Sequence, residues 1–538
     1  MVALKPNPIF PLLIGLTGLL LWAPGPCRGA EALGWGGPSW RPTVLTAADT
    51  AGRQRYEPDR DALMNAMEER LEGLDMDDPD FNIEAYTQGL QDLARNPVNI
   101  NRARAGELAR VPGLDLIRAG AIVRYREEVK PYESVDELAE VEGIGKATVD
   151  KIRAYVTAGE GGALRRDLWT DHRYWTHNSR ATYFSRYQTQ LETPLGYRLP
   201  DSGRGYLGSR AHYYQRLHYQ SDHLSMNLTQ DKDPGEPLGS PAGFDFNSAH
   251  LAIENAGRLQ TLVVGDYSLG FGQGLLLGGR GGFGKGAQVI DAPQASERGV
   301  RPYSSAMESG YWRGAAFTYG SVYQVTGFYS SAARTASAIS ADTVRFPAST
   351  GYHRTTSERA RKDNLSEQLW GGRLRMVTDW GSIGVSGYRV AFGKTIGTGS
   401  GASAIYDFTG DEHTAASVDY RLFLGRLDIY GEGARSRNGA YGLINGLTIP
   451  FESKTALSLA YRCYQKDLQS PYGQGFGGAG GGPANQHGYY VGVRHHPASW
   501  LELKGYFDQY RYPAPRFGEG RPTTGYDWLL RTDVTATA

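Results

Sequence analysis

The sequence predicts a multidomain chain in which a small all-α domain is followed by a large antiparallel transmembrane β-barrel. Three observations predict this fold class. An apolar segment lies at the N-terminus, apolar residues then recur at helical spacing, and from about residue 168 they alternate with polar residues to the end. The 538-residue chain is too long for one ordinary core, and its 71 Gly and 34 Tyr suit many short strands and turns. The formal net charge is zero, which gives no general attraction to nucleic acid or to anionic lipid.

Residues 1–32 have the features of a cleaved signal peptide. A lysine supplies positive charge, residues 9–22 are almost uninterruptedly apolar, and Ala30 and Ala32 provide a small-residue cleavage site. The apolar run is short for a membrane-spanning helix, and an uncleaved anchor is the alternative. Cleavage after Ala32 leaves Cys463 as the only cysteine, which excludes an internal disulfide. We therefore expect an exported protein.

Residues 33–56 are predicted to be a flexible leader, and residues 57–96 an acidic pair of helices. The second range holds twelve Asp or Glu against three Arg. Its four Asp between residues 75 and 80 are not followed by the Gly and Glu that an EF-hand calcium loop needs. We interpret this cluster as a solvated acidic turn, and the sequence predicts no metal or other cofactor.

Residues 97–160 contain a helical unit that occurs twice. The first copy has the turn Pro112-Gly113 and the second has the turn Gly143-Ile144-Gly145. A Glu-Leu pair precedes each turn, and an amphipathic helix follows it. The spacing of about 30 residues indicates an internal repeat of the form helix–turn–helix.

With Asn99-Ile-Asn101, these turns resemble the tandem helix-hairpin-helix domain of ComEA-type competence proteins over about 60 residues. In that family, backbone N–H groups at the start of a helix bind a DNA phosphate without reading the base sequence. The resemblance implies non-sequence-specific binding of DNA. The residues that it assigns to DNA binding are Gly143, Ile144, Gly145, Lys146, Thr148, Pro112 and Gly113.

The first hairpin departs from the family pattern. Asp115 stands where the second Gly belongs, and a carboxylate repels a phosphate. Residues 97–158 hold ten Lys or Arg and ten Asp or Glu, whereas nonspecific DNA-binding proteins are usually basic. The alternative is that the domain contacts periplasmic protein partners, or plugs the barrel, after losing DNA binding.

Residues 168–538 are predicted to form an outer-membrane β-barrel of roughly 14–16 strands. In residues 426–432, for example, Leu427 and Ile429 belong to an outward set that faces lipid, and the inward set is mostly charged. A soluble sandwich or propeller would also alternate, but long polar loops favour a barrel. These loops are residues 231–246, 278–305, 333–365 and 468–488. Because the chain ends on Thr-Ala-Thr-Ala538 and not on an aromatic residue, we expect a barrel truncated at its C-terminus.

Four segments of the predicted barrel resemble an uncharacterised bacterial family, common in Bacteroidetes, that fuses a helix-hairpin-helix domain to a barrel. They are Gly265-Asp266-Tyr267, Phe271-Gly-Gln273-Gly274-Leu275, Gly351-Tyr-His353-Arg354-Thr355 and Asn485-Gln-His-Gly488. The resemblance implies a cell outer-membrane location with the helical domain in the periplasm.

The sequence predicts no enzyme, because no Ser–His–acid set and no zinc spacing is recognisable. His353, Arg354 and Thr355 with Glu358 are interpreted as a polar loop or a lumen lining. The preferred function is a pore whose helical domain captures DNA in connection with uptake or translocation. The alternative is a general outer-membrane channel or structural protein, and an enzyme at the barrel loops is a third and weaker one.

Overall fold

The computed structural model describes residues 98–158 and 175–534, apart from short segments inside both ranges. The predicted signal peptide, flexible leader and acidic helices lie outside the described residues. Among the described helices, none combines the length and the apolar character that are needed to cross a membrane.

The helical domain is built around one core. Its elements are β1 (Val98–Asn99), α5 (Leu116–Glu128), η1 (Val135–Glu140), α6 (Lys146–Ile152), η2 (Arg153–Tyr155) and β2 (Val156–Thr157). Buried apolar residues recur thirty positions apart, so the two copies contribute equivalent side chains to the core. These pairs are Leu108 and Leu138, Val111 and Val141, Leu114 and Ile144, Ala119 and Val149, and Ile122 and Ile152.

The two ends of the helical domain are joined to each other. Strands β1 and β2 pair in parallel, with Val98 opposite Val156. The side-chain nitrogen Nδ2 of Asn101 donates to the backbone oxygens of Tyr132 (2.7 Å) and Ala158 (3.0 Å), and its Oδ1 accepts from the Tyr132 N–H (2.8 Å). Asn101 therefore connects the beginning, the middle and the end of the domain.

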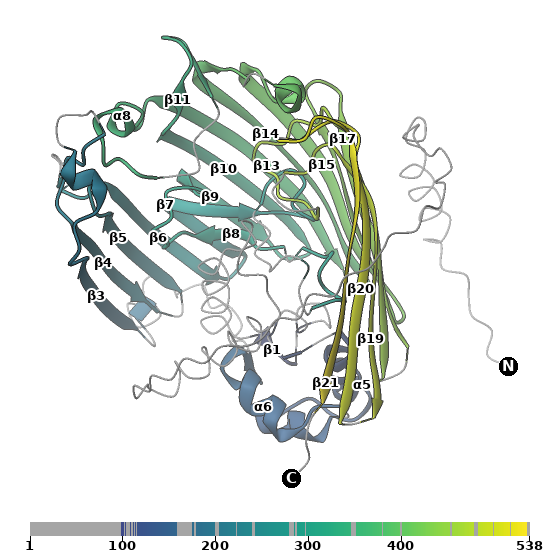
Figure 1. Cartoon of the computed structure of the whole chain (residues 1–538). Coiled ribbons are helices and arrows are strands. Elements are labelled where there is room, and N and C mark those ends of the chain that lie inside the picture. The colour runs from purple at the N-terminus through teal and green to yellow at the C-terminus, as the bar shows by residue number, and fades with distance from the viewer. Residues whose placement is uncertain are drawn as a thin grey trace. The chain divides into compact units, whose positions relative to one another are not determined.

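The rest of the described chain forms one large antiparallel sheet whose strands follow the order of a barrel wall (Figure 1). Its sixteen long strands are β3 (Arg180–Thr189), β4 (Ala211–Gln220), β5 (Leu224–Lys232), β6 (Phe246–Ala256), β7 (Leu259–Gly270), β9 (Trp312–Gly320), β10 (Tyr323–Arg334), β13 (Leu365–Thr378), β14 (Gly381–Ile396), β15 (Gly410–Leu424), β16 (Leu427–Ser436), β17 (Tyr441–Phe451), β18 (Thr455–Tyr464), β19 (Gln486–Ala498), β20 (Leu501–Tyr512) and β21 (Thr523–Val534). The short elements η4 (Leu195–Arg198), β8 (Gly299–Pro302), β11 (Ser337–Ala338), β12 (Thr343–Arg345), α8 (Thr356–Arg359) and η5 (Ala402–Tyr406) lie in the connections.

The connections differ between the two ends of the sheet. At one end, every turn has two or three residues, as in 257–258, 321–322 and 425–426. At the other end most connections are long, and we call that end the long-loop rim. Its long segments are residues 190–210, 233–245, 271–311, 335–364, 397–409, 465–485 and 513–522. This asymmetry is typical of outer-membrane barrels and was predicted from the polar loops.

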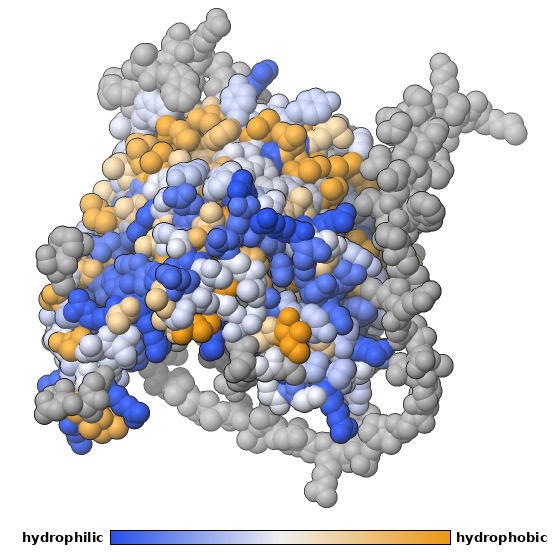
Figure 2. All heavy atoms as spheres, turned by 90° about the horizontal axis from the view of Figure 1, so that it is seen from above, coloured by the Kyte–Doolittle hydropathy of each residue, from blue (hydrophilic) through white to orange (hydrophobic). Residues whose placement is uncertain are grey.

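The strands alternate between two faces, as the sequence predicted. On β5, Asn227 and Thr229 are buried on the inner face, whereas Met226 and Leu228 are exposed on the other face. On β16, Glu432 is buried on the inner face. Figure 2 shows hydrophobic residues gathered together on the visible face, next to a mainly hydrophilic region. The predicted fold class, a small helical domain followed by a sheet of the barrel type, is therefore confirmed.

The wall is open between its first and last strands. β3 pairs with β4, and β21 pairs with β20. Within the described strands, no residue register joins β21 to β3, and the two strands lie apart in Figure 1.

Candidate functional site

The second hairpin has the geometry that the sequence predicted. Gly143 is exposed and has a φ of +83°, a backbone conformation that a side chain strains. The next residue, Ile144, is buried in the core, and its N–H donates to the Val141 oxygen (3.0 Å). Gly145 is the N-cap of α6, and its oxygen accepts from the N–H of Thr148 (2.9 Å).

The surface above the start of α6 is open. A Cβ placed on Gly145 would meet no atom within 4 Å, and a Cβ on Gly143 would not either. Lys146 is exposed at the first position of the helix and forms no ion pair with the described carboxylates, while Thr148 is half-buried. The first N–H groups of a helix have no partner inside the helix, so this turn can receive an anion such as a phosphate.

The first hairpin repeats this turn in part. Gly113 has a φ of +87°, and the N–H of Leu114 donates to the Val111 oxygen (3.0 Å). Pro112 and Asp115 lie outside the described residues. The structure therefore brings Gly113, Gly143 and Gly145 into two similar turns. It does not place the predicted site residue Pro112 or Asp115, the residue at which the first hairpin departs from the family pattern.

The two turns lie side by side, since the side chain of Arg118 contacts both of them. On α5, Arg118 donates from Nε to the Gly143 oxygen and from Nη1 to the Gly113 oxygen, both at 3.1 Å. Sequence reasoning missed Arg118. The signal for it was the repeat itself, because Arg118 stands thirty positions before Thr148, one of the predicted site residues.

Other basic residues of the domain are engaged with its own groups. Arg153 pairs with Asp136, and this hydrogen bond and charge lower the pKa of the Asp136 carboxyl. Lys130 pairs with Glu137 (3.0 Å), and Arg126 donates to backbone oxygens. Lys146, at the second hairpin, is by contrast exposed and forms no ion pair with the described carboxylates.

A second candidate site is the inner face of the sheet, which carries the connection between β7 and β8. We call residues 271–298 the lumenal loop. The N–H groups of Gln273 and Leu275 donate to Oε2 of Glu432 on β16, at 2.7 and 3.0 Å. Gly272 has a positive φ of +57°, and a Cβ there would come within 2.8 Å of that oxygen and 2.9 Å of the Asp419 Cβ, so the position favours glycine.

Further contacts spread the lumenal loop over strands far from β7. Glu297 pairs with Arg373 on β13 (2.9 Å), and Lys285 pairs with Asp508 on β20 (2.5 Å). The hydroxyl of Tyr490 on β19 donates to the Val289 oxygen (2.7 Å). The loop is therefore fastened across the inner face from β13 to β20.

Replacing Glu432 with Ala is expected to release the first part of the lumenal loop. Two hydrogen bonds to a carboxylate are lost, each worth about 1.5–3 kcal/mol. The amides of residues 271–277 should then exchange about 10- to 100-fold faster for each bond lost, as measured by hydrogen exchange and mass spectrometry on the full chain in detergent. The control Glu432→Gln keeps one acceptor oxygen and should speed exchange less. Equal exchange in wild type and Glu432→Ala would contradict the role of these bonds.

A buried polar network holds the long-loop rim together. Oδ1 of Asp245 pairs with Lys362 (2.7 Å), and its Oδ2 contacts Nδ1 of His353 (2.6 Å). The oxygens of Glu236 accept from the N–H groups of His353 (2.8 Å) and Asp233 (2.9 Å). Glu236, Asp245 and His353 lie close enough to hold a metal ion, but each carboxylate oxygen already has a partner within the protein.

The polar residues that follow His353 shape the same rim. Thr355 and Glu358 form a capping box at the start of α8, and Arg354 pairs with Glu358 (3.3 Å). These contacts are those of a structured loop, and Nε2 of His353 also contacts the Thr335 hydroxyl (3.1 Å).

Stability of the rim is expected to fall as the pH rises. Burial, followed by the charge of Asp245, raises the pKa of Glu236 to about 7, and burial raises that of Glu308 to about 9. Both carboxyls bind protons more tightly in the folded state than at their ordinary pKa of 4.5, so their contribution is complete below pH 4.5 and is lost as the pH rises through 7 and 9. Limited proteolysis of residues 303–311 should be faster at pH 9 than at pH 5. Glu308→Gln should flatten this dependence, and equal cleavage at both pH values would contradict it.

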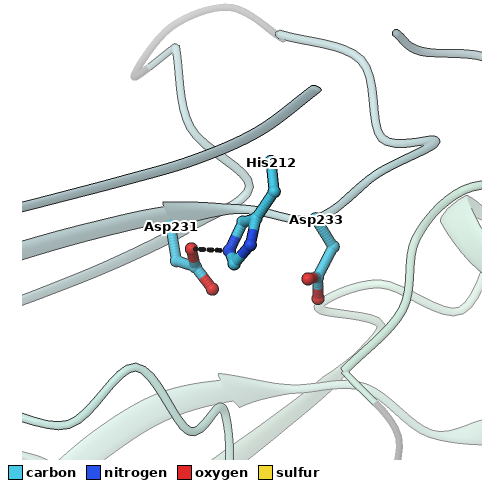
Figure 3. Close-up of side chains that lie close together, drawn as sticks. All are labelled: His212, Asp231 and Asp233. Atoms are coloured by element: carbon cyan, nitrogen blue, oxygen red, sulfur yellow. Dashed lines mark hydrogen bonds and ion pairs between the residues drawn. The ribbon is translucent and has the colours of Figure 1, made fainter. Parts of the chain in front are cut away.

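Three side chains near the same rim form a more open donor set (Figure 3). His212 on β4 contacts Asp231 on β5 (Nε2 to Oδ1, 2.8 Å), and Asp233 lies just beyond the end of β5. Their ligand atoms lie within 4.8 Å of one another. One imidazole and two carboxylates are donors that a divalent transition-metal ion accepts.

The helical domain is similar in sequence to known proteins. Residues 94–157 match the helix-hairpin-helix motif family. An uncharacterised protein of Haemophilus influenzae is 38% identical over 71 residues, which are 13% of this chain and 63% of that protein. ComE operon protein 1 of Bacillus subtilis is 37% identical over 60 residues, 11% of this chain and 29% of that protein. The chain thus spans less than two thirds of the length of these relatives.

The sheet aligns with solved outer-membrane proteins at low similarity. The anion-selective porin from Comamonas acidovorans aligns with 66% of this chain and 98% of its own at 10% identity and a TM-score of 0.30. OmpT of Vibrio cholerae aligns with 67% and 98% at 11% identity and a TM-score of 0.29. At these TM-scores, the barrel-type architecture rests on the strand order, the alternation and the connections described above.

Proposed function

We propose that this chain is an outer-membrane protein whose helix-hairpin-helix domain binds duplex DNA without sequence specificity, in connection with DNA uptake or translocation. The observation that carries the proposal is the second hairpin. Gly143 and Gly145 leave the backbone open at the start of α6, and Lys146 adds a positive charge beside it. The match to the helix-hairpin-helix family supports the same reading of this turn.

The location in the outer membrane, with the helical domain in the periplasm, is part of this proposal. Apolar side chains are exposed on the outer face of many strands, for example Val264, Leu374 and Val385. A strand with one apolar and one polar face is suited to lipid on one side and to water or polar groups on the other. The role that we propose is binding, and it involves no catalysis.

The test is binding of the full chain, in detergent micelles, to fluorescent duplexes of unrelated sequence. Affinity should be equal for all duplexes and should fall linearly with the logarithm of salt concentration, because phosphate contacts release counterions. Absence of binding at low ionic strength would overturn the proposal.

The lumenal loop favours a second candidate function, a general channel or structural protein whose helical domain contacts periplasmic proteins. The loop ties β7 to the inner face of β13–β20, and the helical domain is electrically balanced. Cross-linking of the domain to a periplasmic protein, together with absence of DNA binding, would favour this candidate.

A further inference from the structure

Two of the positions at which the two hairpins differ concern the polar groups of their turns. Position 115 holds Asp where position 145 holds Gly, and position 118 holds Arg where position 148 holds Thr. The first hairpin therefore has a carboxylate in place of an open glycine, and a guanidinium in place of a hydroxyl. The two copies provide equivalent core residues but different polar groups beside their turns.

Arg118 connects the two turns through the rigid shape of its side chain. Its Nε and Nη1 donate to the oxygens of Gly143 and Gly113, which are thirty residues apart in the sequence. The donors of a guanidinium lie in one plane at fixed spacing, so two such bonds fix both acceptors relative to each other. A lysine has a single charged nitrogen and cannot reproduce this fork.

The bond to the Gly143 oxygen also controls the orientation of the second turn. The Gly143 carbonyl and the Ile144 N–H belong to the same planar peptide unit, so neither can rotate without the other. The N–H of Ile144 donates to the Val141 oxygen, and Gly145 follows as the N-cap of α6. Arg118 thus restrains the peptide that leads into the proposed phosphate-binding turn.

We propose that the two hairpins have different roles. The second hairpin binds the DNA phosphate, and the first hairpin supplies Arg118 as a positioning residue that holds the second turn in its binding geometry. This inference rests on the proposed DNA binding of the domain. The role that it assigns to the first hairpin does not require a phosphate at the first turn, so it is compatible with Asp115 there.

The experiment compares three variants of the full chain in detergent. Arg118→Met removes the donors, Arg118→Lys keeps the charge without the fork, and Arg124→Met removes one positive charge from an exposed position on the same helix. Hydrogen exchange of residues 141–149 reports on the turn without any ligand. Anisotropy of a fluorescent 20-base-pair duplex, at several salt concentrations, reports on binding.

Both Arg118 variants should raise exchange in residues 141–149 about tenfold, whereas Arg124→Met should leave it unchanged. Arg118→Lys should weaken duplex binding about tenfold with the wild-type salt slope, because the charge is kept and the positioning is lost. Wild-type affinity in Arg118→Lys, or equal exchange in the Arg118 and Arg124 variants, would overturn the inference. If wild type itself does not bind DNA, the proposed function fails. A faster hydrogen exchange in the Arg118 variants than in wild type would then show that Arg118 has a structural role only, and the inference would be overturned as well.

Discussion

Replacing Gly145 with Asp is expected to weaken binding of duplex DNA by about a hundredfold or more. The substitution places a carboxylate where a phosphate would approach the start of α6. Two unit charges 4 Å apart repel by about 4 kcal/mol at an effective dielectric constant of 20, and each 1.4 kcal/mol is a factor of ten in affinity. The measurement is duplex binding by the full chain at several salt concentrations.

This substitution should leave the fold of the domain intact. Gly145 has an ordinary φ of −86°, and a side chain there would meet no atom within 4 Å. Gly143, by contrast, has a positive φ, so a substitution there would affect the fold of the turn as well as the binding of the ligand. Gly145→Asp is therefore the cleaner variant.

Gly120→Asp is the matched control, because a Cβ on this α5 residue also meets no atom within 4 Å. It adds the same charge to the same domain at a position inside α5 that belongs to neither turn. Gly120→Asp should weaken binding only slightly, and Gly145→Ala should lie between wild type and Gly145→Asp. Equal losses in Gly120→Asp and Gly145→Asp would show that only net charge matters and that the turn is not the contact.

Replacing Asp508 with Leu is expected to destabilise the sheet by about 3–5 kcal/mol, because it leaves the buried Arg462 without its counter-charge. Arg462 on β18 donates from both Nη atoms to Asp508 on β20, at 2.8 and 3.0 Å, and its Nε donates to Gln486 (2.7 Å). Lys285 of the lumenal loop pairs with the same carboxylate. Both Arg462 and Asp508 are completely buried.

Unfolding of the full chain in urea, followed by the gel-mobility shift between folded and heat-denatured protein, measures this loss. The control is Glu412→Ala, which removes a partly exposed ion-pair partner of two exposed arginines, Arg389 and Arg437. Exposed pairs contribute about 0–1 kcal/mol, so this variant should unfold near the wild-type midpoint. Similar midpoints for Asp508→Leu and Glu412→Ala would contradict a stabilising role for the buried pair.

Local patterns predicted the local parts of the structure. The alternation around Leu427 and Ile429 predicted which face of β16 is outward, and the polar runs predicted the long-loop rim. The glycine pattern Gly143-Ile144-Gly145 predicted the second turn, because a positive φ and a helix start depend on neighbouring residues.

Contacts between distant segments were not predictable in the same way. The lumenal loop reaches Glu432 over more than 150 residues of sequence, and His353 reaches Asp245 over more than 100. Such pairs depend on how the strands register around the sheet, which a single sequence pattern does not encode. Several segments recognised by resemblance proved to contain these anchoring residues. In one of them, the side chain of Asn485 bonds both the N–H and the oxygen of Ala514.

The parallel pairing of β1 with β2 has a mechanical consequence for the helical domain. In a parallel pair, the incoming chain and the outgoing chain leave from opposite ends of the ladder. A pull applied between the two ends of the domain therefore loads the β1–β2 bonds and the Asn101–Ala158 bond together, in shear, instead of peeling them apart one after another. We therefore expect the ends of the domain to resist tension along the chain better than an antiparallel pair would, a property that would suit the proposed binding of DNA.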